Sequence, residues 1–455
     1  MVTFLIDQAL RKMQRTTSGA RLLASAARAA WNRGGAEVPE SETEYGAGLL
    51  YHLQARRLRA TLRHAAADSP FYRELLGRGA ADIRDVADLH SLPFTNRDAF
   101  ADWRRFIAVP MDRIARTVTS AGTFGQPKTV VFAQDDWSQV CTSRSVAIGA
   151  LLQKKRAAGN VRALLLLPSD APMWAETMST SSALTLLGVD ILSASTSDPE
   201  SAVRWLVEYR PQIIAGSAAA LWELSRCAQD VGFSYQPDLL LCLGESCPAD
   251  IAERLTALWA CAPTLSYGSA EIGGSQTISF PGCRGLHLNT LDFLWEIIDP
   301  ESGEPAPMGE LVVTTLLRNA MPLIRYRTGD TARWVSHSCR LPFPSVEVLG
   351  PDDTLVWEGN RFSATELSAR IRAHSGNAGR IEISADGEHG DESLRCVVEG
   401  DPSDGDQESQ LRALLSTDHR AIADGSPDSA RFELTVTAEL ASQPKLYRVL
   451  DRRVR

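Results

Sequence analysis

Residues 161–168 read VRALLLLP, and two runs of the same kind follow, PQIIAGS at 211–217 and DLLLCLGE at 238–245. Each run is short and apolar and is bounded by Pro, Gly or polar residues, as a buried strand is. The segments DPESAVRWLVEY (198–209) and AALWELSRCAQDV (219–231) separate them and have the apolar spacing of helices. Such alternation predicts an α/β fold, a mostly parallel sheet with helices on its faces. The small residues that end each run mark the edge where such sheets bind ligands.

The same patterns predict the domain organisation. Residues 1–350 predict a large N-terminal domain and 351–455 a small, mobile α+β C-terminal domain, because the pattern breaks at VLGPDDT. The large domain has three parts: a helical lead-in (1–115), an α/β core (116–285) and a β-subdomain (286–350), in which strand patterns follow one another without helices. Two amphipathic helices and several strands are expected in the small domain.

Composition and charge exclude several classes of function. The chain has 455 residues and a formal net charge of −9, whereas nucleic-acid binders usually show a basic face. No apolar run approaches the roughly 20 residues that span a bilayer. Residues 1–31 have the pattern of an amphipathic helix rather than a secretory signal, with a transit peptide as the alternative. The eight cysteines form no dense disulfide pattern. We therefore expect a cytoplasmic protein with reduced thiols and with neither nucleic acid nor membrane as a partner.

The stretch TSAGTFGQPK at 119–128 combines the features of a phosphate-binding loop. Two glycines allow close backbone approach to an anion, two hydroxyls can donate hydrogen bonds, and a lysine adds positive charge. These residues are Ser120, Gly122, Thr123, Gly125 and Lys128. The chain has no G-x-x-x-x-G-K-[ST] motif, and an ordinary Gly-containing turn between strands is the alternative.

Three further segments have residues that suit a nucleotide. SYGSAEIGG places Tyr267, whose ring can stack on a base, four residues before Glu271, whose carboxylate can hold Mg²⁺ beside phosphates. YRTGD ends in Asp330, which can accept hydrogen bonds from both ribose hydroxyls. Lys445, near the C-terminus, could reach a phosphate from a mobile domain. Each residue taken alone also has an alternative without a function: the tyrosine could be part of the core, the acids could lie on the surface, and the lysine could be solvated.

Together, and in this order, the motifs resemble those of the adenylate-forming (acyl-activating) enzymes, and within them the phenylacetate–CoA ligase-like branch. TSAGTFGQPK resembles the family's phosphate loop, LGES (243–246) its Gly-Gly-Glu segment beside the adenine, and YGSAE its Tyr-Gly-x-Thr-Glu motif. PLIRYRTGD (322–330) matches the branch residue for residue, and PKLYRVLD (444–451) resembles the segment with the catalytic lysine. The resemblance covers nearly the whole chain after the first fifty or so residues.

The resemblance implies a two-step reaction with ATP, Mg²⁺ and coenzyme A. A carboxylate attacks the α-phosphorus of ATP, pyrophosphate leaves, and the thiol of coenzyme A then takes the acyl group from the adenylate. The first step brings two anions together and needs positive charge. By resemblance, Lys445 supplies it, Glu271 holds Mg²⁺ and Asp330 holds the ribose. The residues implied to frame the adenine are Gly244, Glu245, Tyr267 and Gly268. The small domain is expected to rotate about Asp352 or Asp353 between the steps.

The chain departs from the family pattern at several positions. Ala121 and Phe124 replace a Ser and a Thr in the phosphate loop, and Gln126 replaces a Lys. Pro351 stands where an Arg that helps hold the ribose is usual, and Pro444 replaces the Gly before the lysine. Each lost contact costs on the order of 1–3 kcal/mol in the transition state. We therefore expect a low rate, or an unusual substrate or acceptor.

Two short pairs, Cys283 with His287 and His337 with Cys339, flank the β-subdomain. Some members of the branch have a Cys/His zinc site at these two places, so the resemblance implies structural Zn²⁺ with Cys₂His₂ ligation. The alternative is two core cysteines and two unrelated histidines.

The acyl pocket is implied by family geometry alone. It is expected near PMWAET (172–177), AGSAA (215–219) and SYGSAEIGG (266–274). The residues assigned to it are Trp174, Ser217, Ser266 and Gly273. Analogy gives an aromatic or other compact apolar acid as the substrate.

The sequence therefore predicts an AMP-forming ligase that joins a small carboxylic acid to coenzyme A, in a branch whose members are often homodimers. One alternative acceptor is a carrier-protein thiol or an amine. A second alternative is a non-catalytic acyl- or nucleotide-binding relative, which the lost loop hydroxyls favour. The retained Lys445, Glu271 and Asp330 argue against that last reading.

Overall fold

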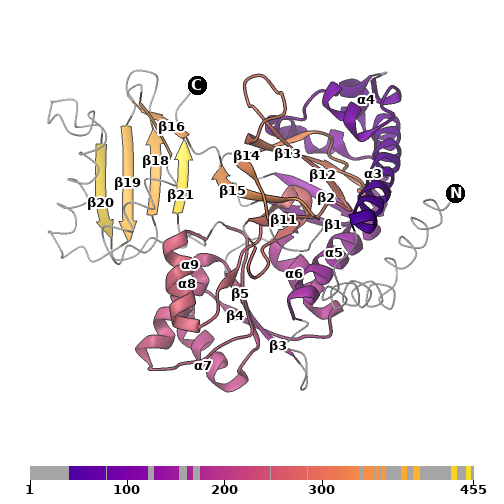
Figure 1. Ribbon diagram of the computed structural model, residues 1–455. Coiled ribbons are helices and arrows are strands. Elements are labelled where there is room, and N and C mark those ends of the chain that lie inside the picture. Colours follow the sequence, from indigo (N-terminus) through magenta and orange to yellow (C-terminus); the bar gives the residue numbers. More distant parts are fainter. Residues whose placement is uncertain are drawn as a thin grey trace.

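The three apolar runs form neighbouring strands of a five-stranded parallel sheet in the computed structural model (Figure 1). The strand order is β4-β3-β5-β6-β7. The strands are β3 (Arg162–Leu167), β4 (Asp190–Ser195), β5 (Ile213–Gly216), β6 (Leu239–Cys242) and β7 (Pro263–Thr264). The predicted α/β class with a parallel sheet is confirmed.

Helices cover both faces of this sheet because successive side chains of a strand point to opposite faces. Leu164 of β3 packs with α7, α8 and α9, whereas Leu165 packs with α5 and α6. The strand residues at the centre of these two clusters are buried, and Leu167, Ile191 and Leu192 are partly buried. The helices are α5 (Gln134–Leu152), α6 (Ala175–Leu186), α7 (Pro199–Tyr209), α8 (Ala218–Asp230) and α9 (Ala249–Trp259). Burial on both faces explains why the strands are continuously apolar rather than alternating.

An antiparallel sheet follows in the chain, as the strand patterns after residue 286 predict. Its order is β10-β11-β15-β14-β13-β12. The strands are β10 (Thr277–Ile278), β11 (Leu286–Leu288), β12 (Phe293–Ile298), β13 (Met308–Thr315), β14 (Tyr326–Val335) and β15 (Ser345–Pro351). Two smaller antiparallel pairs accompany it: β1 (Ile114–Thr119) with β2 (Thr129–Ala133), and β8 (Gly268–Ser269) with β9 (Gly274–Ser275).

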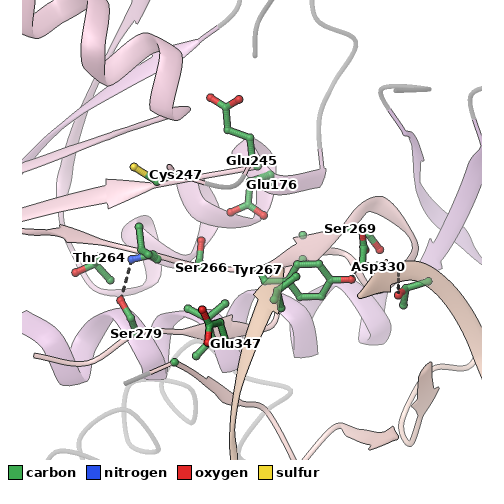
Figure 2. Close-up of a pocket in the computed structure, with 18 of the residues that line it drawn as sticks. Glu176, Glu245, Cys247, Thr264, Ser266, Tyr267, Ser269, Ser279, Asp330 and Glu347 are labelled. Carbon is green, nitrogen blue, oxygen red and sulfur yellow. Dashed lines mark hydrogen bonds between the residues drawn. The ribbon is translucent and has the colours of Figure 1, made fainter. Parts of the chain in front are cut away.

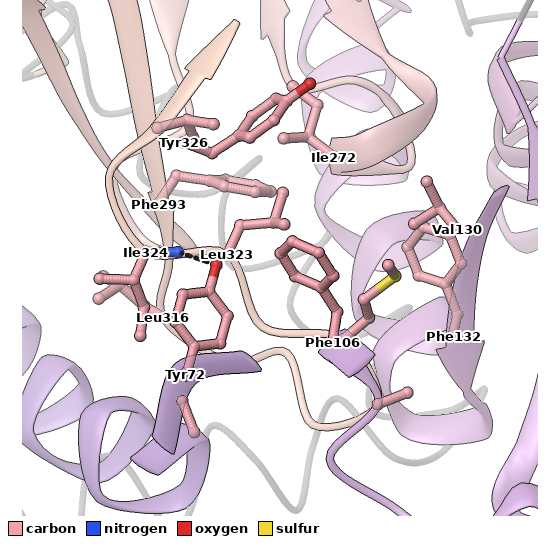
Figure 3. Packing of buried hydrophobic residues seen from close by; sticks show 14 of the residues in the cluster. Tyr72, Phe106, Val130, Phe132, Ile272, Phe293, Leu316, Leu323, Ile324 and Tyr326 are labelled. Atoms are coloured by element: carbon pink, nitrogen blue, oxygen red, sulfur yellow. Dashed lines mark hydrogen bonds between the residues drawn. The ribbon is translucent and has the colours of Figure 1, made fainter. Parts of the chain in front are cut away.

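The N-terminal part is helical and packs onto this second sheet through a shared core. It consists of α3 (Glu40–Asp68), α4 (Pro70–Leu76) and the 3₁₀ segments η2 (Gly79–Ala81), η3 (Val86–Ser91), η4 (Arg97–Phe106) and η5 (Met111–Arg113). The hydroxyl of Tyr72 accepts the backbone N–H of Ile324 at 2.9 Å, and Figure 3 shows this bond inside the apolar cluster around Phe106. The bond fixes the segment that leads into β14, and thereby the start of the RTGD motif.

The structure describes residues 40–77, 79–120, 128–152, 161–167, 175–245, 247–283, 285–337 and 343–351, and six strands after residue 351. Those strands are β16 (Thr354–Trp357), β17 (Asn360–Ser363), β18 (Ile381–Asp386), β19 (Ser393–Glu399), β20 (Phe432–Thr437) and β21 (Tyr447–Asp451). The helices predicted for the small domain lie outside the described residues, as do Asp352 and Asp353. None of the helices in the described part of the chain has the length and apolarity that crossing a bilayer requires.

Candidate active site

A cavity of about 1070 Å³ lies at the carboxyl ends of β6 and β7, where an open α/β sheet binds ligands. Its volume is slightly above the usual range for ligand pockets, roughly 300–1,000 Å³. Its lining includes residues of four of the predicted motifs, namely Ser120, Lys128, Gly244, Glu245, Ser266, Tyr267, Gly268, Glu271 and Asp330. The structure therefore brings together segments that are far apart in the sequence.

Lys128 and Glu271 form a buried ion pair at one side of the cavity. The Nζ of Lys128 lies 2.6 Å from Oε1 of Glu271, and the two side chains are 13% and 5% exposed. The hydroxyl of Tyr326, at the start of β14, donates to the same oxygen at 2.7 Å and lies 2.8 Å from Lys128 Nζ. This arrangement holds a positive and a negative charge at fixed positions beside the loop 119–128.

The ion pair sets the charge state of Glu271. Burial raises the pKa of this carboxyl, but the charge of Lys128 and the hydrogen bonds from Lys128 and Tyr326 outweigh burial and lower the pKa to about 2. Burial lowers the pKa of Lys128, and the nearby Arg97 adds to this effect, whereas Glu271 opposes it. Glu271 is therefore an anion at neutral pH and is available to a cation.

The Tyr267–Asp330 pair lies in the same cavity. The hydroxyl of Tyr267 donates to Oδ2 of Asp330 at 2.5 Å, and Figure 2 shows the Tyr267 ring beside Asp330. Burial and the carboxylate of Asp330 together raise the pKa of Tyr267 well above its ordinary value, so the phenol stays protonated and remains a donor. Pro351 of β15 faces Asp330 in the strand register, so the usual Arg is absent beside this carboxylate.

The ends of the glycine loop are fixed against each other. The backbone N–H of Lys128 donates to Ser120 Oγ at 2.9 Å, and the N–H of Ser120 donates to the carbonyl of Lys128, also at 2.9 Å. This pairing continues the antiparallel ladder of β1 and β2, so the predicted strand–loop–strand arrangement is present. Gly122, Thr123 and Gly125 lie outside the described residues.

Glu245 is held at the N-terminus of α8. Its Oε1 accepts the N–H of Ala219 at 2.8 Å, in the same turn where Ser217 caps the helix by accepting the N–H of Ala220. The favourable interaction of an anion with a helix N-terminus orients this carboxylate next to Gly244 at the cavity wall.

The residues predicted for the acyl pocket are only partly brought together. Ser266 lines the cavity, but Ser217 and Gly273 are not among its lining residues. Ser217 serves as the helix cap, and Gly273, at φ +85°, packs close to Val140 of α5. Trp174 lies outside the described residues.

The curated relatives are phenylacetate–coenzyme A ligases. The protein of Thermus thermophilus is 28% identical over 349 residues, covering 71% of this chain and 75% of that protein. The protein of Aromatoleum evansii is 25% identical over 429 residues, covering 89% and 94%. The chain is thus similar to phenylacetate–coenzyme A ligases over most of its length. This similarity supports an AMP-forming acid–thiol ligase, as the sequence predicted.

A solved structure of a CoA ligase has a similar fold. The 2-hydroxyisobutyryl-CoA ligase in complex with 2-HIB-AMP matches with a TM-score of 0.68 over 88% of both chains, at 16% identity. No protein-family model matches the chain.

Three of the four predicted zinc ligands lie close together in the described structure. Ligand atoms of Cys283, His287 and His337 all lie within 4.8 Å of one another, and Cys283 Sγ is 3.0 Å from His287 Nε2. His287 Nδ1 lies 2.9 Å from the carbonyl of Phe343, which orients the other ring nitrogen toward the sulfur. Cys339, the fourth predicted ligand, lies outside the described residues.

Several residues of the site were not singled out from the sequence. Tyr326 bonds to both Lys128 and Glu271. It lies inside the PLIRYRTGD match, so the motif itself could have pointed to this residue. Arg97 lines the cavity and occupies space that a Cβ on Gly329 would fill. Glu176 also lines the cavity, and only its long-range partners distinguish it from other helix acids.

Proposed function

We propose that the chain uses ATP to convert a carboxylic acid into an acyl-adenylate and then transfers the acyl group to the thiol of coenzyme A. The acid's oxygen bonds to the α-phosphorus as the bond to pyrophosphate breaks. The thiol then attacks the acyl carbon, and AMP leaves. The Tyr267–Asp330 pair beside the Lys128–Glu271 pair in one cavity carries the proposal, because it combines a ribose acceptor, an aromatic face and fixed charges.

The nucleotide is assigned to the motif residues. Asp330 holds the ribose hydroxyls, since Oδ2 is oriented by Tyr267 and carboxylates accept from vicinal hydroxyls. Tyr267 and Gly268 frame the adenine together with Gly244 and Glu245. Ser120, Gly122, Thr123, Gly125 and Lys128 are assigned to the β- and γ-phosphates, and Lys128 is the cation of this set.

Glu271 is the residue assigned to Mg²⁺. Lys128 and Tyr326 both bond to Oε1, so Oε2 is the oxygen assigned to the ion. An ionised carboxylate is a ligand that Mg²⁺ prefers, and Mg²⁺ bound there would reduce the negative charge of the departing pyrophosphate.

Lys445 is proposed as the residue that reduces the repulsion between carboxylate and α-phosphate. It precedes β21, whose first residue Tyr447 pairs in parallel with Ile381 of β18. A small domain (351–455) that turns about Asp352 or Asp353 would bring Lys445 to the cavity for adenylation and remove it for thiol attack. The large domain would then be 1–350.

The Cys283, His287 and His337 cluster is proposed as a structural zinc site with Cys339 as the fourth ligand. A thiol and two imidazoles suit tetrahedral Zn²⁺, and the bond to Phe343 orients Nε2 of His287 toward Cys283 Sγ. A cytoplasmic location, a homodimer, and a carrier-protein thiol or an amine as the alternative acceptor stay predictions from the sequence.

Pyrophosphate exchange tests the first step. The full-length protein is incubated with ATP, Mg²⁺, labelled pyrophosphate and one carboxylic acid at a time, with a no-acid control. Acid-dependent label in ATP is expected. If no acid in a broad aliphatic and aromatic panel supports exchange, the chain is a non-catalytic relative. Where exchange occurs, acid-dependent consumption of coenzyme A thiol distinguishes coenzyme A from the alternative acceptors.

A further inference from the structure

Two cysteines bracket the part of the cavity wall that is assigned to the adenine. Cys242 is the last residue of β6 and is 1% exposed, whereas Cys247 lies two residues before α9 and is partly buried. Cys247 lines the cavity, and Figure 2 shows it on the same side of the Tyr267 ring as Glu245. Gly244 and Glu245 lie between the two cysteines in the chain. The pair therefore combines one cysteine that borders the cavity with one that is covered.

The two thiols are in contact. Cys247 packs against the apolar cluster that contains Cys242 and residues of α8 and α9. The thiol of Cys247 donates to the carbonyl of Pro248 at 3.9 Å, and its sulfur accepts a hydrogen bond from the thiol of Cys242. This bond and burial raise the pKa of Cys242 well above its ordinary value, so Cys242 keeps its proton. The fold thus holds two thiols side by side before any reaction.

The surroundings of the pair favour covalent chemistry over metal binding. Structural Zn²⁺ takes four ligands, and two thiolates supply half of them. Among the described residues, the one group of three or more side chains placed to bind a metal is Cys283 with His287 and His337. Cys242 and Cys247 are not part of that group. Two adjacent thiols without further ligands can instead form a disulfide.

A peroxide is the oxidant that this reaction requires. The sulfur of Cys247, which the cavity makes accessible, attacks one oxygen of hydrogen peroxide. The O–O bond breaks, a sulfenic acid forms and water leaves. The sulfur of Cys242 then attacks the Cys247 sulfur, so that the S–S bond forms, the S–O bond breaks and a second water leaves. The two thiols lose two electrons in total, and these reduce the peroxide to water.

A disulfide at this position would change the cavity wall. A covalent bond brings two sulfurs closer together than a hydrogen bond does, and β6 is fixed between β5 and β7, so Cys247 is the partner that moves. Gly244, at φ +74°, and Glu245 connect the two cysteines and move with it. Both residues line the cavity, and Glu245 depends on its 2.8 Å bond from the N–H of Ala219. Oxidation therefore displaces the residues assigned to the adenine.

We propose that Cys242 and Cys247 are a redox modification site, at which a reversible disulfide weakens the binding of ATP. The inference rests on the proposed function, because that function assigns Gly244 and Glu245 to the nucleotide. It adds regulation by peroxide to the same cavity. A disulfide of this kind fits a chain whose thiols are otherwise reduced, since disulfides in reducing compartments are usually transient and redox-sensing.

Peroxide treatment of the full-length protein tests the proposal. Reduced protein is exposed to a small excess of hydrogen peroxide, and one sample is blocked with N-ethylmaleimide for peptide mapping. Mapping should find a disulfide between Cys242 and Cys247. Titration calorimetry with ATP should show binding at least about tenfold weaker than in the reduced protein, a loss of about 1.4 kcal/mol. Dithiothreitol should reverse both changes.

The outcomes distinguish this inference from the proposed function. If no disulfide forms at this pair, or if the disulfide leaves ATP binding unchanged, the inference is wrong while the proposed function stands. If the reduced protein binds no ATP, the proposed function fails and the switch with it.

Two variants show whether this pair causes the loss. Cys247→Ala removes the thiol that reacts first, and Cys242→Ala removes its buried partner, so one gives a result if the other fails to fold. After peroxide, either variant should bind ATP within about twofold of its own reduced form. Cys227→Ser is the matched control, because Cys227 is a partly buried cysteine of α8 outside the cavity lining, and it should respond as the wild type does. A tenfold loss in peroxide-treated Cys247→Ala, or protection by Cys227→Ser, would overturn the assignment.

Discussion

The hydroxyl of Tyr267 lies 2.5 Å from Oδ2 of Asp330, although 63 residues separate them in the chain. The second sheet explains the contact, because β14 brings Asp330 to the cavity edge that Tyr267 borders. Tyr267 thereby orients one oxygen of the carboxylate that we assign to the ribose.

We predict that Tyr267→Phe weakens ATP use without affecting the acid. The ring remains for stacking, but Asp330 loses the bond that orients it, which is worth about 1 kcal/mol, or roughly five- to tenfold in the KM for ATP. Steady-state exchange kinetics measure this, with the KM for the acid expected to change less than about twofold. Tyr235→Phe is the control, because Tyr235 donates to the carbonyl of Pro211 outside the cavity. An unchanged KM for ATP in Tyr267→Phe would argue against this role of the pair.

Replacing Lys128 should destabilise the free protein strongly. Lys128→Met keeps an unbranched side chain of similar length but removes the ammonium group. Glu271 is then a buried anion without its counter-charge, which costs about 3–5 kcal/mol. Urea unfolding without ATP measures the difference. The exposed pair Arg105–Glu74 has a similar N–O separation, 2.5 Å, so Arg105→Met is a matched control with an expected loss below about 1 kcal/mol. Equal losses would show that burial of the Lys128–Glu271 pair does not matter.

The parts of the fold that could be predicted are those with a local signal. The runs 161–168, 211–217 and 238–245 are apolar over the length of one strand, and they became β3, β5 and β6. The 3₁₀ segments of the lead-in could not be resolved from helix patterns. Their positions depend on distant contacts such as Tyr72 with Ile324, 252 residues apart.

The site divides in the same way. The family resemblance implied that Lys128, Tyr267, Glu271 and Asp330 serve one nucleotide site, and the described structure brings them to one cavity. The sequence did not reveal the buried Arg144–Glu176 pair. Glu176 resembles any helix acid until the fold places Arg144 beside it, 32 residues earlier in the chain.

The stability of the protein should depend on the protonation of Glu271. Its pKa is about 2 in the folded protein, against 4.5 ordinarily, so folding favours the anion. The stabilisation is complete above about pH 4.5 and is lost as the pH falls toward 2. The gap in unfolding free energy between the wild type and Glu271→Gln should therefore shrink by about 2 kcal/mol between pH 7 and pH 3. Urea unfolding at several pH values checks this, with the exposed Glu253→Gln as the reference for loss of one acid. A gap independent of pH would contradict the assignment.

Lys445→Ala should separate the two half-reactions. Without the lysine, the charge repulsion between acid and α-phosphate is not offset, and pyrophosphate exchange should fall by about 10²–10³-fold, the effect of removing one transition-state donor. Transfer from a chemically supplied acyl-adenylate to coenzyme A should stay within about threefold of the wild type, because the proposed rotation takes Lys445 out of the cavity before that step. Equal losses in both half-reactions would contradict a domain rotation between them.

The Cys283, His287 and His337 cluster should contain zinc in the purified protein. Elemental analysis of the full chain, prepared without added metal, is expected to give about one zinc per chain, since a closed Cys₂His₂ set binds Zn²⁺ tightly. Cys283→Ser removes a soft ligand 3.0 Å from His287 Nε2 and should lower the zinc content well below that. Cys227→Ser is the control, because Cys227 lies in α8 and outside the cluster. Its zinc content should equal that of the wild type. Wild-type protein with little or no zinc would reject the site and leave the three residues as a packed Cys/His contact.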